Sequence, residues 1–202
     1  VSSGTAAVFL ALKALDIEPG SDVIVSPVCN PGGIMPVAVQ DVKLVIPDSS
    51  PNSFNISPEE FERAITPNTR AAVLTHLGGQ VIDLDPILEM SRSKGIRIIE
   101  DCSQATGALY KGKRVGSFGE IAAFSTMFSK TLATGGTGGL VYTKNKDYYW
   151  YLRTLADRGK PYHDPGFHFR NTTNYLFPSL NFNADELSCA IGDPCIETPK
   201  SF

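Results

Sequence analysis

The stretch DLDPILEMSRSKGIRIIED, residues 83–101, contains one complete helix-to-strand unit. In its first half the apolar residues recur at helical spacing, and the Lys94-Gly95 pair that follows is a typical helix stop. The next four residues, IRII, are mostly apolar, as expected of a strand that is covered on both faces. The carboxylates Glu100 and Asp101 come directly after them. The stretch therefore predicts a buried parallel strand with acidic side chains at its carboxyl end.

The same alternation extends over most of the chain. Helices are predicted at Thr5–Leu15, Ser57–Ile65, Asp83–Ser93 and Asn145–Arg158, and strands at Asp22–Val28, Val42–Ile46, Ala71–Leu77, Ile96–Ile99, Ile121–Ser125 and Leu140–Thr143. Such alternation is typical of a three-layer α/β/α sandwich with a mainly parallel sheet. Past Lys160 the pattern fades, apart from a short helix at Ala184–Ile191, and residues 192–202 are expected to find nothing to pack on. We therefore predict a single domain over residues 1–202.

The composition excludes several classes of function. The chain has 202 residues, a net charge of -3 and a pI near 5.6. No basic stripe with interleaved aromatic residues is present, so nucleic acid is not an expected partner. No apolar run is long enough to span a membrane. The four cysteines form no C-x-x-C pair and the three histidines form no ligand set, so we expect reduced thiols, a cytoplasmic location and no metal site.

Polar residues gather where open α/β sheets bind ligands, beyond the carboxyl ends of the strands. The segment SGTA (residues 3–6) opens a predicted helix. Its free N–H groups suit a phosphate, although a plain capped helix start is the commoner case. Asp101 is either a solvated strand end or the partner of a cation. Gln104 follows in the next turn, and Ser125 ends another predicted strand.

A single lysine, Lys130, occurs in the stretch AAFSTMFSKTLATGGTGGLVYT (residues 122–143), which contains no acidic residue. A lysine in a glycine-rich loop is by default a surface residue, but an amine beside an anion cradle can attack an aldehyde. Pyridoxal phosphate needs such an amine, a phosphate cradle, a carboxylate for its ring nitrogen and a group beside its ring. The chain offers all four, in Lys130, in residues 4–6 with Ser125, in Asp101 and in Gln104.

Several segments resemble those of the DegT/DnrJ/EryC1/StrS family. They are SGTAA (residues 3–7), FNISPEEFERAITPNTRAAVLTHLGGQVIDLDPI (54–87), EDCSQATGALYKGKRVGSFGEIAAFS (100–125), SKTLATGGTGG (129–139) and LNFNADELSCAIG (180–192), in the family's order. Members of this family are fold-type-I pyridoxal phosphate enzymes, mostly nucleotide-sugar aminotransferases. The resemblance implies the large, cofactor-binding domain of such an enzyme. We expect this domain to be truncated at both ends and to lack the C-terminal small domain.

The resemblance also assigns roles to residues. Lys130 matches the family's Schiff-base lysine, and Asp101 matches the carboxylate that keeps the pyridine nitrogen protonated. Gln104 matches a contact to the ring near its hydroxyl group. The phosphate is assigned to Gly4, Thr5, Ala6 and Ser125. Asn181 matches an asparagine that reaches the phosphate of the neighbouring subunit, which implies a homodimer with shared sites.

The function implied by the resemblance is transfer of an amino group from an amino acid, by family habit glutamate, to a nucleotide-linked keto-sugar. The setting would be the biosynthesis of cell-surface polysaccharides or of secondary-metabolite sugars. One alternative is a non-catalytic relative that binds the cofactor or a sugar nucleotide in a regulatory or assembly role. A dehydratase branch has histidine where this chain has Lys130. No nucleotide-binding glycine motif of the G-x-G-x-x-G or Walker type is present.

Three positions depart from the family's pattern. The usual aromatic residue that stacks on the cofactor is missing near Cys29-Asn30-Pro31. Thr137 stands in the glycine run where an acidic residue is common. Asn183 stands where an arginine usually follows the asparagine at 181. We expect the isolated 202 residues to retain the cofactor weakly and to turn over little substrate.

Overall fold

The computed structural model of the chain describes residues 1–168, 170 and 172–197. Its helices are α1 (Gly4–Ala14), α2 (Pro31–Ala38), α3 (Pro58–Ala64), α4 (Leu84–Lys94), α5 (Lys146–Ala156) and α6 (Glu186–Glu197). Its strands are β1 (Asp22–Val25), β2 (Lys43–Val45), β3 (Thr69–Thr75), β4 (Arg97–Asp101), β5 (Leu109–Tyr110), β6 (Lys113–Arg114), β7 (Ile121–Ser125) and β8 (Gly139–Tyr142). Short 3-10 turns lie at Leu77–Gly79 and Thr172–Asn174.

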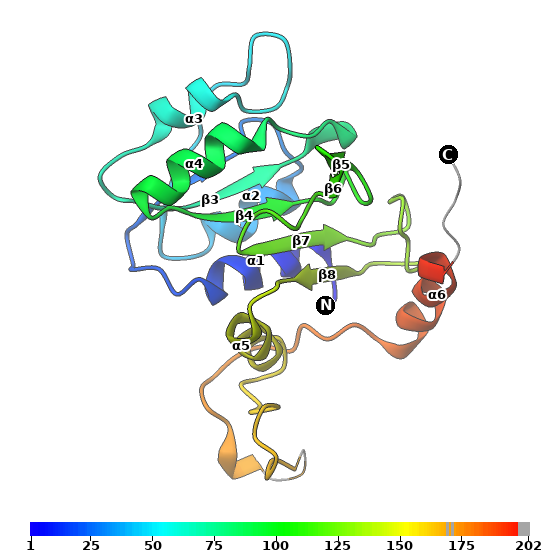
Figure 1. The fold of residues 1–202 in the computed structure, drawn as a ribbon. Coiled ribbons are helices and arrows are strands. Elements are labelled where there is room, and N and C mark those ends of the chain that lie inside the picture. The colour runs from blue at the N-terminus through cyan, green and yellow to red at the C-terminus, as the bar shows by residue number, and fades with distance from the viewer. Residues whose placement is uncertain (169, 171, 198–202) are drawn as a thin grey trace.

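Six of these strands form one sheet in the order β2-β1-β3-β4-β7-β8 (Figure 1). Every neighbouring pair from β2 to β7 is parallel, and only the edge strand β8 runs antiparallel to its neighbour β7. The central strands are apolar because both of their faces are covered, as in other parallel sheets. The mainly parallel α/β sheet predicted from the sequence is confirmed.

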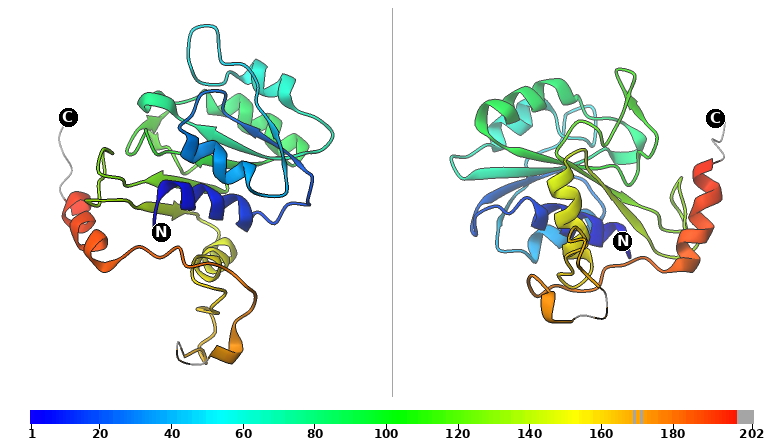
Figure 2. Two further views of the ribbon diagram at one scale, coloured as in Figure 1. Left: turned by 180° about the vertical axis from the view of Figure 1, so that it is seen from behind. Right: turned by 60° about the horizontal axis from the view of Figure 1, so that its bottom comes forward.

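Helices cover both faces of the sheet, which gives three layers (Figures 1 and 2). On one face, α1 and α5 pack with Val37 of α2 against β1, β3, β4 and β7. On the other face, Phe61 of α3 and the apolar side of α4 pack against Ile24, Leu74 and Ile98. Two separate cores therefore hold the sheet rigid between them, and the carboxyl ends of its strands are fixed in position.

Helix α2 was not predicted from the sequence. Its eight residues, PGGIMPVA, include two prolines and two glycines, which normally argue against a helix. Proline is nevertheless well tolerated in the first turn, and Asn30 caps the helix by accepting the N–H of Gly32 at 3.0 Å. The Asn30-Pro31 pair was therefore a helix-start signal that the sequence analysis missed.

The end of the chain also differs from expectation. Helix α6 does not stop at Ile191 but continues to Glu197, and it packs on the connection between β7 and β8. A Cβ atom placed on Gly192 would lie 2.8 Å from Cγ2 of Thr134. The prediction that residues 192–202 find nothing to pack on is therefore wrong for Gly192, while residues 198–202 lie outside the described part of the chain.

None of the helices in the described residues combines the length and the apolar character that a membrane span needs.

Candidate cofactor site

A cavity of about 270 Å³ lies at the carboxyl ends of β4 and β7, beside the N-termini of α1 and α2. Its lining residues are Ser3, Gly4, Thr5, Val8, Asn30, Gly32, Gly33, Asp101, Ser103, Gln104, Ser125, Met127, Lys130, Thr137 and Gly138. This is the edge of a parallel sheet at which ligands bind in open α/β folds.

Six of the eight cofactor-binding residues predicted from the sequence line this cavity: Gly4, Thr5, Asp101, Gln104, Ser125 and Lys130. They come from parts of the chain more than a hundred residues apart, so their convergence is a result of the fold. The other two, Ala6 and Asn181, do not line the cavity. The roles assigned to all eight residues stay predictions.

The first turn of α1 provides an anion-binding surface. Ser3 caps the helix, because its Oγ accepts the N–H of Ala6 at 3.1 Å and its carbonyl accepts the N–H of Ala7 at 3.0 Å. The N–H groups of Gly4 and Thr5 find no acceptor within the described residues, as is usual at a helix start. Free N–H groups at the positive end of a helix dipole bind phosphate well. The N–H of Ala6 is already used by the cap.

Glycines allow three elements to meet at the cavity. A Cβ atom on Gly4 would lie 2.6 Å from Cβ of Ser125, so only glycine lets the end of β7 approach the start of α1 this closely. A Cβ atom on Gly32 would lie 2.8 Å from Oγ1 of Thr5, which brings the first turn of α2 against α1 in the same way. The shape of this end of the cavity depends on both approaches.

Asp101 ends β4 with its side chain directed at the cavity, and the residue is 5% exposed. Its Oδ1 accepts the N–H of Ser103 at 3.1 Å, and its Oδ2 accepts the hydroxyl of Thr75 at a long 3.5 Å. Within the part of the chain that the structure describes, no Lys, Arg or His nitrogen lies within 4.0 Å of this carboxylate. A buried carboxylate without a cation is costly. Asp101 is therefore suited to pair with a cation held in the cavity.

Gln104 is oriented by the turn after β3. Its Oε1 accepts the N–H of Gly78 at 2.9 Å. Gly78 has φ of +61°, a left-handed conformation that favours glycine. With its oxygen engaged in this way, the side-chain amide of Gln104 is left to offer its N–H groups to the cavity.

Lys130 lies on the connection between β7 and β8 and is half-buried at the cavity wall. Its backbone N–H donates to the carbonyl of Met127 at 2.9 Å, which closes a turn just before it. Among the described residues, no carboxylate oxygen lies within 4.0 Å of its Nζ. The amine is therefore held at the cavity wall without an ion pair to a carboxylate.

The wall that faces Asp101 is made by α2 rather than by an aromatic ring. Asn30, Gly32 and Gly33 line it, and no aromatic side chain is among the lining residues of the cavity. A Cβ atom on Gly33 would lie 3.1 Å from Oδ2 of Asp101. Burial, and secondarily the charge of Asp101, raise the pKa of the nearby Cys29 thiol, so it stays protonated and is a poor nucleophile. Sequence reasoning missed this wall because it missed α2.

Asn181 is exposed and lies away from the cavity, on the segment that joins α5 to α6. It forms an isolated antiparallel bridge with Asp157, and its Oδ1 accepts the N–H of Asn183 at 3.0 Å. Asp157 is held in turn by Lys160, whose Nζ donates to it at 2.8 Å. Asn181 is thus fixed on the surface, where it does not reach the cavity of its own chain.

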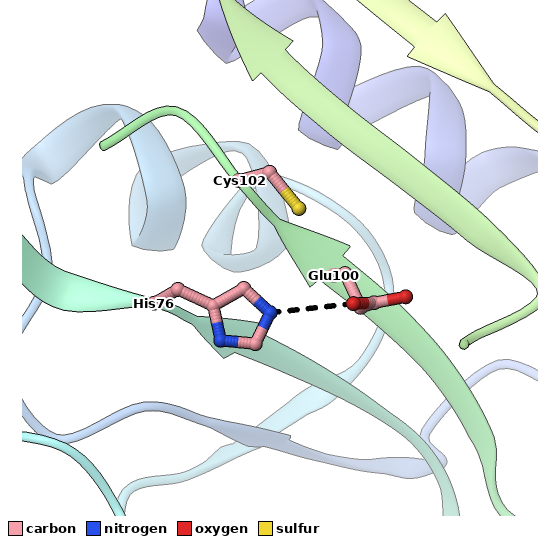
Figure 3. Close-up of side chains that lie close together, drawn as sticks. All are labelled: His76, Glu100 and Cys102. Atoms are coloured by element: carbon pink, nitrogen blue, oxygen red, sulfur yellow. Dashed lines mark hydrogen bonds and ion pairs between the residues drawn. The ribbon is translucent and has the colours of Figure 1, made fainter. Parts of the chain in front are cut away.

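A second polar cluster lies on the other side of β4, in which His76, Glu100 and Cys102 are all buried (Figure 3). Nδ1 of His76 accepts the N–H of Ile82 at 3.3 Å, and its Nε2 lies 3.3 Å from Oε2 of Glu100, so both ring nitrogens are engaged. Burial raises the pKa of the Cys102 thiol far above its ordinary value. A protonated thiol and an engaged imidazole are poor metal ligands, so we interpret the cluster as structural.

Glu100 holds the loop before β7 against the sheet. Its carboxylate accepts the N–H groups of Gly116 and Phe118 at 2.8 Å and that of Gly119 at 2.7 Å, besides the contact with His76. Burial alone would raise the pKa of Glu100, but these hydrogen bonds outweigh it and lower the pKa below its ordinary value. The carboxylate is therefore charged and fully satisfied in the folded protein.

Replacing Glu100 with glutamine should destabilise the fold by about 2–4 kcal/mol, because an NH₂ group would then face backbone donors. Urea denaturation at neutral pH measures the loss, and Glu89→Gln on the exposed side of α4 is the matched control. A depressed pKa stabilises the fold above the unfolded pKa, and that contribution disappears as the pH falls. The difference between wild type and Glu100→Gln should therefore shrink below about pH 4. A constant difference down to pH 3 would contradict this interpretation.

The chain was compared with known proteins. The profile of the DegT/DnrJ/EryC1/StrS aminotransferase family matches residues 1–197. The chain belongs to this family. It is 37% identical over 193 residues to the GDP-perosamine synthase of Caulobacter vibrioides. The matched stretch covers 95% of this chain and 49% of that protein. The family resemblance expected from the sequence is confirmed.

Solved structures of relatives have the same fold. An aminotransferase from Psychrobacter cryohalolentis superposes with a TM-score of 0.89 at 33% identity, over 97% of this chain and 50% of that one. A GDP-4-keto-6-deoxymannose-3-dehydratase with a trapped PLP-glutamate geminal diamine gives a TM-score of 0.90 at 26% identity. The match covers 98% of this chain and 55% of that one. The chain thus spans about half the length of these relatives. The predicted fold class, that of fold-type-I pyridoxal phosphate enzymes, is confirmed, and pyridoxal phosphate is the cofactor of this family.

Proposed function

We propose that the protein is a pyridoxal phosphate-dependent aminotransferase that moves an amino group from an amino acid, glutamate, to a nucleotide-linked keto-sugar. The observation that supports it best is the cavity. It combines an amine without an ion pair (Lys130), a buried carboxylate without a cation (Asp101) and a helix start with two free N–H groups (Gly4 and Thr5).

The residues of the cavity fit the cofactor group by group. When bound, pyridoxal phosphate supplies an aldehyde that condenses with amines, with loss of water, and a ring that withdraws electrons from the attached carbon. The N–H groups of Gly4 and Thr5 and the hydroxyls of Thr5 and Ser125 would hold its phosphate. Asp101 would pair with the ring nitrogen and keep it protonated, and the side-chain N–H of Gln104 would donate beside the ring.

Lys130 has two roles in this proposal. Its Nζ is the amine that anchors the cofactor between reactions. Once released from the cofactor, the same Nζ would take a proton from the α-carbon of the amino donor as general base and later give that proton back as general acid. Both roles need an amine that is not held in an ion pair, and among the described residues no carboxylate oxygen lies within 4.0 Å of this Nζ.

Gly4→Ala should damage the phosphate end of the cavity. The new Cβ would lie 2.6 Å from Cβ of Ser125, so α1 or β7 must shift. We expect a loss of stability of about 1–3 kcal/mol and cofactor affinity about tenfold weaker, because overpacking here displaces the anion site itself. Gly136→Ala is the matched control, since no atom lies within 4 Å of a Cβ at that position. Thermal melting and a cofactor titration give both values, and normal affinity in Gly4→Ala would remove Gly4 from the site.

The proposed acceptor is a ketone on a nucleotide-linked sugar, since only a carbonyl can condense with the aminated cofactor. The relative from Caulobacter vibrioides, named as a GDP-perosamine synthase, supports this substrate class. The biosynthesis of cell-surface polysaccharides or of secondary-metabolite sugars is the proposed setting. The presence of Lys130 favours transamination over dehydration, because the dehydratase branch has histidine at this position.

The decisive experiment follows the absorbance of the complete gene product with pyridoxal phosphate. Glutamate should shift the visible band and release oxoglutarate in one turnover, and a nucleotide keto-sugar should restore the band. A band that forms but does not respond to any amino donor would favour the alternative, a non-catalytic relative that binds the cofactor or a sugar nucleotide. No band at all would contradict the cofactor assignment for this protein.

Two further proposals concern the assembly and its location. We propose a homodimer with shared sites, because Asn181 is held on the exposed surface outside its own cavity, where a neighbouring subunit could be reached. Sedimentation of the complete protein and exchange of Asn181→Ala subunits with Lys130→Ala subunits would test the shared site.

We also propose a cytoplasmic location, because Cys29, Cys102 and Cys189 are free thiols, as is usual in a reducing compartment.

A further inference from the structure

The connection that carries Lys130 is closed at its base by a pair of threonine hydroxyls. Oγ1 of Thr134 donates to the carbonyl of Thr126 at 2.9 Å, and the two hydroxyl oxygens lie 2.9 Å apart. The Thr134 hydroxyl also lies 3.4 Å from the carbonyl of Thr137, and either hydroxyl can donate in the contact between the two threonines. We call this pair the threonine clasp. It joins the two ends of the segment 127–133, with Lys130 in its middle.

Backbone hydrogen bonds surround the clasp. The N–H of Thr134 donates to the carbonyl of Thr126, and the N–H of Thr126 donates to the carbonyl of Gly138, both at 2.9 Å. Thr126 is 2% exposed. A Cβ atom on Gly138 would lie 2.3 Å from Oγ1 of Thr126 and 2.4 Å from Oγ1 of Thr134, so the hydroxyls occupy the space beside this glycine. Gly138 and Lys130 both line the cavity, which places the clasp directly behind it.

Helix α6 backs the clasp from outside. A Cβ atom on Gly192 would lie 2.8 Å from Cγ2 of Thr134, so the backbone of α6 at this glycine lies closer to the methyl group of Thr134 than a larger residue would allow. A second contact lies one residue along, where a Cβ atom on Gly135 would be 2.9 Å from Cδ1 of Ile191. Thr134 is thus held by its hydroxyl on the cavity side and by its methyl group on the α6 side.

We propose that Thr134 is a positioning residue for Lys130. The clasp fixes both ends of a short loop and so restricts where the amine in its middle can go, which favours the position at the cavity wall. Thr134 itself does not line the cavity. The inference rests on the proposed function, because it concerns the amine that anchors the cofactor.

The test compares three variants of the complete protein. Thr134→Val keeps the β-branched shape but removes the hydroxyl, and Thr134→Ser restores the hydroxyl. Thr143→Val is the matched control, because its hydroxyl also donates to a backbone carbonyl, that of Glu120 at 2.8 Å, just beyond β8 at the opposite end of the hairpin. Hydrogen exchange of residues 126–138 in cofactor-free protein reports on the loop. The rate at which pyridoxal phosphate becomes attached to Lys130, trapped with borohydride and measured by mass spectrometry, reports on the amine.

We expect faster exchange of the loop and about tenfold slower attachment in Thr134→Val, the equivalent of one hydrogen bond. Thr134→Ser and Thr143→Val should stay within about twofold of wild type, with similar melting temperatures for the two valine variants. Equal attachment rates in wild type and Thr134→Val would overturn the inference, as would an equal loss in Thr143→Val. If wild type itself never attaches the cofactor, the proposed function and the inference fail together. If wild type attaches it and Thr134→Val attaches it equally fast, only the inference fails.

Discussion

Replacing Lys130 with alanine is expected to abolish covalent attachment of the cofactor and to lower turnover by about 10³-fold or more, since both the anchoring amine and the general base are lost. Lys130→Arg should fail as completely, because a guanidinium stays protonated and cannot attack an aldehyde. This second variant separates the need for an amine from the need for a positive charge. The measurements are borohydride trapping with mass spectrometry and single-turnover oxoglutarate release from glutamate.

The matched control is Lys113→Ala, an exposed lysine on the β5–β6 hairpin, which should behave as wild type. Phosphate contacts at α1 are untouched in every variant, so non-covalent binding of the cofactor should persist in Lys130→Ala. If Lys130→Arg retains substantial turnover, Lys130 acts only through its charge. In that case the amine that reacts must be sought elsewhere in the protein.

Asp101→Asn is expected to have the second largest effect. Asparagine has nearly the same shape but no charge, so the ring nitrogen would lose the partner that keeps it protonated. Attachment of the cofactor to Lys130 should persist, while transamination should fall about 10²- to 10⁴-fold, because the unprotonated ring withdraws electrons poorly. The separation of attachment from turnover is the diagnostic result.

A cofactor analogue with carbon in place of the ring nitrogen sharpens this test. With the analogue, wild type and Asp101→Asn should be equally slow, because the carboxylate then has nothing to protonate. Asp85→Asn is the matched control, since Asp85 forms an exposed ion pair with Lys111 that contributes little. An Asp101→Asn variant that works normally with the natural cofactor would show that the carboxylate has another role.

The sequence predicted the parts of the site that depend on single strands and their ends. A mostly apolar strand followed by Glu100 and Asp101, and another strand that ends at Ser125, place Asp101 and Ser125 at one edge of a parallel sheet. The helix start at residues 3–6 was predicted from its small polar residues, and the structure brings its first turn to the same edge. These inferences succeed because the strand and cap signals are local.

Other parts of the site depend on contacts that no local signal reveals. Helix α2 was missed because its prolines and glycines outweighed the cap at Asn30, and the cavity wall was missed with it. The clasp between Thr126 and Thr134 exists only because the loop folds back on itself. The extension of α6 past Ile191 brings Gly192 against Thr134, a contact between parts of the chain that are far apart in sequence.

The contact between Gly4 and Ser125 has a consequence for the order in which the molecule folds. The anion site belongs to the first residues of the chain, whereas the strand end and the amine that complete it lie more than a hundred residues later. Contacts of such sequence separation slow folding, because a long loop must close before they form. As the chain leaves the ribosome, α1 can pack on α2 and on the earlier strands, but its contact with the end of β7 must wait until Ser125 has emerged. The pocket is among the last features to form, so binding of cofactor would report on completed folding.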